Sequence, residues 1–120
     1  MSTVKKLRKP TVTQAYNTMV RYFSRPDAKL SKGEHGLCYY RHPDDGRACA
    51  VGCLLSDEVA EEMDEGAGSW ARADLAPEVR HWMSDETLHR FLVDAQRAHD
   101  EAESVAHFLD DLETIYKGIA

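Results

Sequence analysis

The C-terminal stretch 84–116 decides the fold, and its sequence is SDETLHRFLVDAQRAHDEAESVAHFLDDLETIY. Apolar residues recur in it at spacings of three and four, the period of one face of an α-helix. They fall into two runs, Leu88, Phe91, Leu92 and Ala95, then Val105, Phe108, Leu109 and Leu112. Ser84 stands where a helix-capping side chain is expected before the first run. The stretch therefore predicts an antiparallel pair of helices.

Further helices are expected toward the N-terminus. Thr11 and Gln14 match a capping box, and apolar residues follow at helical spacing, so we predict a first helix over about 11–24. A short acidic helix is expected after Ser56, and a brief one beginning at Pro77. The terminal helix pair is expected to pack on the first helix.

The segment 37–51 has a different pattern. Tyr39 and Tyr40 favour a strand, and the run His42-Pro43-Asp44-Asp45-Gly46 favours a tight turn. The following residues, 47–55, leave open a returning strand or a short buried helix, because short apolar runs do not separate the two. We predict a mainly helical fold, α+β at the margin, with about five helices and one short strand or β-hairpin at 37–51.

The chain is long enough for one hydrophobic core. Its 120 residues hold 42% apolar and 30% charged residues, which is typical of a folded domain with a well-solvated surface. Residues 11–120 are expected to form a single globular domain. No apolar run approaches the roughly 20 residues that cross a bilayer, and no secretory signal is present, so we expect a cytoplasmic protein without a membrane partner. Residues 1–10 are expected to form a flexible basic arm that carries Lys5, Lys6, Arg8 and Lys9.

Charge is divided unevenly along the chain. Residues 1–50 carry ten Lys or Arg and four Asp or Glu, whereas residues 51–120 carry five and seventeen. The basic arm suggests contacts with phosphates, and the acidic half suggests contacts with a basic protein surface. The acidic residues that we expect to bind a partner are Glu58, Glu61, Glu62, Asp110 and Asp111.

Three cysteines, Cys38, Cys49 and Cys53, are expected to be reduced thiols. Cys49 and Cys53 are four residues apart, which on a helix places both on one face, and Cys38 with either His42 or His35 would complete a tetrahedral zinc site. The spacing lacks the Cys-x-x-Cys knuckle of structural zinc sites. Packed thiols without a cofactor are therefore favoured, and zinc is the alternative.

Two further groups are candidates for chemistry. Cys38 or Cys49 would act as a nucleophile if a histidine such as His42 activated it, but no local arrangement supports this. His99 and Asp100 form a candidate functional dyad. Because His99 continues an apolar helix stripe, we favour a histidine at the edge of the core.

Several short runs resemble a group of small bacterial and phage proteins of uncharacterised activity. The runs are Cys38-Tyr39-Tyr40-Arg41, then Cys49-Ala50-Val51-Gly52-Cys53-Leu54, and later Gln96-Arg97-Ala98-His99-Asp100. They match a signature Cys-x-Tyr-Arg, Cys-Ala-Val-Gly-x-Leu and Gln-x-x-His-Asp that spans most of residues 37–100. The chain departs from that pattern at Ser56, where the group has proline, and the position of Cys53 often holds another residue. The resemblance implies a phage or prophage context and no catalytic residue.

These observations favour a small non-enzymatic binding protein, phage or prophage encoded, that contacts a host protein through an acidic helical surface in the host cytoplasm. Two alternatives stay open. One is a small cysteine- or zinc-dependent enzyme with its site in residues 38–53. The other is a nucleic-acid binder that uses the basic N-terminal half.

Overall fold

The computed structural model describes residues 7–32, 39–65 and 78–119. The fold is mainly helical, as predicted, with four α-helices and two short 3₁₀ helices in this part of the chain. In chain order they are α1 (Val12–Phe23), η1 (Gly52–Leu54), α2 (Asp57–Glu65), η2 (Arg80–Ser84), α3 (Glu86–Glu101) and α4 (Val105–Ile119).

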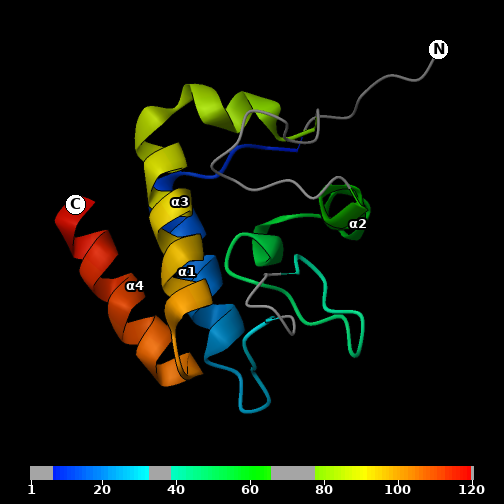
Figure 1. Cartoon of the computed structure of the whole chain (residues 1–120). Helices are drawn as coiled ribbons and strands as arrows, with labels where there is room; N and C mark the ends of the chain where they lie inside the picture. Colours follow the sequence, from blue (N-terminus) through cyan, green and yellow to red (C-terminus); the bar gives the residue numbers. More distant parts are fainter. Residues whose placement is uncertain (1–6, 33–38, 66–77, 120) are drawn as a thin grey trace.

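Helices α3 and α4 form the predicted antiparallel pair, and α1 packs against both (Figure 1). Aromatic rings join them: Phe23 of α1 meets Phe108 of α4 edge to face, with ring centroids 4.9 Å apart. Both rings are almost completely buried, as is Trp82 of η2. The core therefore lies between the three long helices, and η1 and η2 close it at its margins.

The helix starts follow the sequence in one case and differ from it in another. Thr11 and Gln14 form the predicted capping box at α1. At α3 the cap is Asp85, whose side chain accepts from the N–H of Leu88 at 3.0 Å, and not Ser84. Ser84 still belongs to η2, so the extended backbone that a cap needs begins one residue later.

The predicted strand or hairpin at 37–51 is not found in its described part, residues 39–51, which form an irregular loop. The main-chain N–H groups of Tyr40 and Arg41 donate to the carboxylate of Asp64 in α2, at 2.8 and 3.0 Å. A side chain thus takes the place that a partner strand would have. The open question over 47–55 is answered by a short helix, η1.

The described end of the basic arm is attached to the body. Leu7 donates its N–H to the carbonyl of Glu78 at 2.9 Å, and its own carbonyl accepts from the indole N–H of Trp82 at 3.2 Å. Lys9 forms an ion pair of 3.1 Å with Asp85. These bonds join residues 7–9 to Glu78, to η2 and to the start of α3. Of the other arm residues, Arg8 is exposed, while Lys5 and Lys6 lie outside the described residues.

Candidate functional site

The candidate dyad of His99 and Asp100 lies at the end of α3, and the His99 ring is fully buried. Phe23 and Phe108 pack against the ring, with centroids at 5.9 and 5.7 Å. Nε2 of His99 accepts the main-chain N–H of Ser31 at 3.1 Å, and Nδ1 lies 3.0 Å from the carboxylate of Asp100. The ring therefore bridges α3 and the segment that follows α1.

These partners fix the tautomer of His99. A main-chain N–H can only donate, so Nε2 carries the lone pair and Nδ1 carries the proton, which it donates to Asp100. A general base needs a free nitrogen that faces a substrate. Both nitrogens of His99 are bonded inside the protein, so the dyad acts as a structural bridge in this arrangement.

Gln96 extends this bridge to the cysteine segment. Its side-chain amide donates to Asp100 at 3.0 Å, and its oxygen accepts the main-chain N–H of Val51 at 3.1 Å. Gln96, His99 and Asp100 lie three and four residues apart, so they share one region of the surface of α3. The Gln-x-x-His-Asp run thereby joins α3 to two separate loops, through Ser31 and Val51.

The thiols of Cys49 and Cys53 make local bonds within the same turn. Sγ of the buried Cys49 accepts the N–H of Gly52 at 3.3 Å, and Sγ of Cys53 donates to the carbonyl of Ala50 at 3.1 Å. Burial, together with the neighbouring Cys49, raises the pKa of Cys53 to about 12. Because the thiolate is the nucleophile and the metal ligand, Cys53 is in the unreactive form at neutral pH.

His42 is buried in the loop, and both of its nitrogens have partners. Nδ1 accepts the N–H of Asp44 at 3.2 Å, so Nε2 carries the proton and donates to the carbonyl of Lys32 at 3.1 Å. No group of three His, Cys, Asp or Glu side chains arranged to hold a metal occurs among residues 7–32, 39–65 and 78–119. Cys38 lies outside the described residues, so zinc binding stays a prediction.

Two side chains that were not predicted to bind the main chain, Arg41 and Asp64, hold the loop in place. The guanidinium of Arg41 donates to the carbonyls of Gly52 at 2.7 Å and Leu55 at 2.9 Å, and it pairs with Asp57 at 3.1 Å. The carboxylate of Asp64 accepts hydrogen bonds from the main-chain N–H groups of Tyr40 and Arg41. Arg41 belongs to the Cys-x-Tyr-Arg run, but the spacing of that run does not predict which carbonyl groups Arg41 binds. The spacing of residues in α2 likewise does not predict that the carboxylate of Asp64 turns toward the loop.

The acidic residues that we expected to bind a partner form two separate groups. Glu58, Glu61 and Glu62 are exposed on α2, whereas Asp110 and Asp111 lie on α4. In Figure 1 these two helices are on opposite sides of the molecule, with α1 and α3 between them. The structure therefore offers two acidic surfaces and not one.

The two acidic surfaces differ in how far their charge is neutralised. On α4, Glu113 forms an ion pair with Lys117 at 2.7 Å, and Nε2 of His107, whose Nδ1 accepts the N–H of Glu103, lies 3.2 Å from Asp111. Helix α2 has six acidic residues among nine and no Lys or Arg of its own. Within the part of the chain that the structure describes, Glu58 and Glu61 have no ionic partner.

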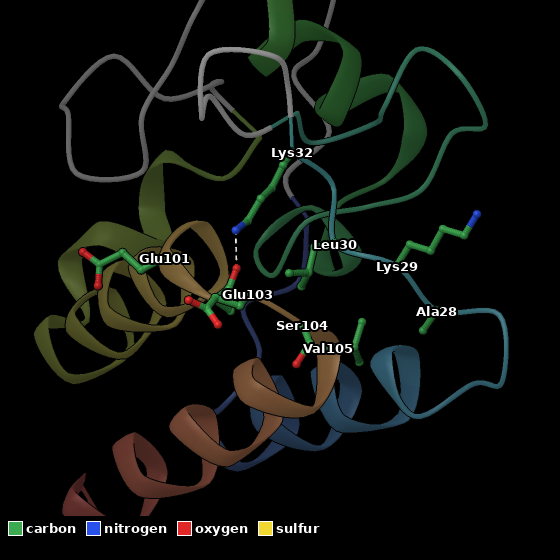
Figure 2. A pocket seen from close by; sticks show the side chains of 9 residues that line it. Ala28, Lys29, Leu30, Lys32, Glu101, Glu103, Ser104 and Val105 are labelled. Atoms are coloured by element: carbon green, nitrogen blue, oxygen red, sulfur yellow. Dashed lines mark hydrogen bonds between the residues drawn. The ribbon is translucent and has the colours of Figure 1, made fainter.

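An open pocket of about 490 Å³ lies where the segment 28–32 meets the connection between α3 and α4. Figure 2 shows Lys32 reaching across it, where its ammonium group donates to the carbonyl of Ala102. Glu101 and Glu103 line the far wall, so lysine and glutamate charges balance there. No feature of the sequence predicted this pocket, because its walls are 70 residues apart along the chain at the Lys32–Ala102 bond.

Comparisons of the chain with protein-family models, with curated proteins and with solved structures found no match. The resemblance to small bacterial and phage proteins thus stays a prediction. Within the described residues, no helix is both long and apolar enough to cross a membrane.

Proposed function

We propose that this chain is a non-enzymatic binding protein that contacts a basic surface of another protein through the outer face of α2. We also propose that the chain is encoded by a phage or prophage and that its partner is a protein of the host cytoplasm. One observation carries it: α2 exposes Glu58 and Glu61, without ionic partners among the described residues, on a helix that has no basic residue.

The internal bonding of the other candidate residues supports the proposal. His99 and His42 use both ring nitrogens inside the protein, and the pKa of Cys53 is raised by burial. These groups stabilise the fold where they are. The exposed carboxylates of α2 are, by contrast, available to steer and pair with a basic partner, which is the usual role of complementary charge at an interface.

The test is a comparison of two variants that each lose two negative charges. Wild-type protein is immobilised and used to capture a partner from a bacterial lysate, and the affinity of the purified partner is then measured. We expect Glu58→Gln/Glu61→Gln to weaken binding by about tenfold, because each exposed charge pair contributes up to about 1 kcal/mol. We expect binding to weaken also as salt concentration rises.

The matched control is Asp110→Asn/Asp111→Asn on α4, which changes net charge equally and should leave the affinity unchanged. Binding that survives the α2 change but not the α4 change would move the interface to α4. Retention of DNA or RNA, and of no protein, would favour the nucleic-acid alternative. Circular dichroism of each variant checks that the helices are intact.

A further inference from the structure

The segment 28–32 forms one wall of the open pocket, and few bonds hold it to α3 and α4. The N–H of Ser31 donates to Nε2 of His99, and the ammonium of Lys32 donates to the carbonyl of Ala102 (Figure 2). The hydroxyl of the buried Ser31 also donates to the carbonyl of Tyr39 at 2.7 Å, but this bond leads to the neighbouring loop. The bond to His99 is therefore one of two described hydrogen bonds that join this wall to the helix pair.

The Ser31 bond requires a neutral imidazole. When His99 gains a proton, Nε2 becomes a donor and faces the N–H of Ser31, so two donors oppose each other. Nδ1 keeps its bond to the carboxylate of Asp100, and this bond becomes stronger because it then joins opposite charges. Asp100 therefore holds the His99 ring in place, so the segment 28–32 has to move.

The surroundings of the ring contain few other charges. From α1 and α4 it meets the neutral rings of Phe23 and Phe108. From the segment 28–32 the nearest charge-bearing residue along the chain is Lys32, whose carbonyl also accepts from His42. On α3 itself, Asp100 is the carboxylate that faces His99, and the side-chain amide of Gln96 donates to the same oxygen of Asp100, Oδ1.

We propose that His99 is an acid-sensitive latch: its protonation breaks the bond between Ser31 and α3, leaves the segment 28–32 joined to the helix pair through the Lys32–Ala102 bond, and widens the pocket between that segment and residues 101–105. Histidine is the side chain whose charge changes nearest to physiological pH. The latch is independent of the acidic face of α2, and either proposal can fail without the other.

The test uses NMR on the full ¹⁵N-labelled chain at about pH 7.5 and about pH 5. We expect the protection factor of the Ser31 amide to fall about tenfold, the factor that corresponds to one net hydrogen bond. The amide of Met19, buried in the middle of α1, should keep its protection. The ¹⁵N shifts of the His99 ring should show the neutral Nδ1–H form at the higher pH, and its protonation should coincide with the loss at Ser31.

The variant His99→Gln provides a non-titrating acceptor for Ser31, and in it the protection of the Ser31 amide should not depend on pH. Three results would overturn the proposal. The first is protection of the Ser31 amide that stays constant with pH in the wild-type chain. The second is a loss of protection that the Met19 amide shares, and the third is a loss of protection at Ser31 that does not coincide with protonation of the His99 ring. If His99→Gln does not fold, the wild-type ring shifts still decide the question.

Discussion

The three-helix core of α1, α3 and α4 and the segment 39–55 are stabilised in different ways. In the core, rings such as Phe23 and Phe108 exclude water and touch each other. In the segment, side chains bind main-chain groups: Asp64 accepts two amides, and Arg41 donates to the carbonyls of Gly52 and Leu55. The core therefore depends on buried area, and the segment depends on a few directional bonds.

The largest effect is expected from removing an aromatic ring in the core. Phe108→Ala should lower the free energy of unfolding by about 3–5 kcal/mol, because it creates a cavity between α1 and α4. Urea unfolding followed by circular dichroism measures this. The control Tyr39→Ala removes a ring that is 37% exposed in the segment and should cost less than about 1 kcal/mol. Equal losses in the two variants would contradict the comparison.

A smaller loss of stability is expected at Gly52, where the segment 39–55 has no space for a side chain. A Cβ at Gly52 would lie 2.5 Å from the carbonyl oxygen of Tyr40 and 3.1 Å from its Cα. Gly52→Ala should therefore destabilise the protein by about 2–3 kcal/mol, since backbone atoms must move. The control Gly118→Ala has nothing within 4 Å and lies in α4, so it should be neutral or slightly stabilising. Thermal melts of the two variants are compared.

The directional bonds of the segment are tested at Asp64. Asp64→Ala leaves the amides of Tyr40 and Arg41 without their acceptor and should cost about 1–2 kcal/mol. Hydrogen exchange should accelerate at those two amides more than at Met19 in α1. The control Asp110→Asn removes one carboxylate from the exposed surface of α4. Uniform acceleration through α1 would show that Asp64 supports the whole fold and not the segment.

The smallest effect concerns Asp85 at the start of α3. The N–H of Leu88, followed by Lys9, lowers the pKa of Asp85 below its usual range. A lowered pKa in the folded state adds stability above the ordinary pKa of an aspartate, and this stability is lost as pH falls through the folded-state value. Asp85→Asn keeps a capping oxygen but loses the charge, so its melting temperature should approach that of wild type in acid. Asp94→Asn, in the middle of α3, controls for net charge.

The sequence predicted some features of the site and missed others for identifiable reasons. The stripe of α3 indicated that His99 lies at the edge of the core, and the structure buries its ring completely. The aromatic content of Tyr39 and Tyr40 predicted a strand, which the described residues 39–51 do not form, and the carboxylate of Asp64 binds the amides that a ladder would use. The sequence also grouped the acids of α2 and α4 together, and only the packing separates them (Figure 1).

The sequence by itself determined the helices, from the capping box at Thr11 to the paired stripes of α3 and α4, because residues three or four apart meet on one helix face. The tertiary structure decided what the Gln-x-x-His-Asp run does and where the segment 39–55 runs. Those features depend on bonds between distant residues: Val51 and Gln96 are 45 positions apart, and Ser31 and His99 are 68. Such bonds form only when helices and loops that are distant in the sequence pack against each other, and the spacing of neighbouring residues does not predict that packing.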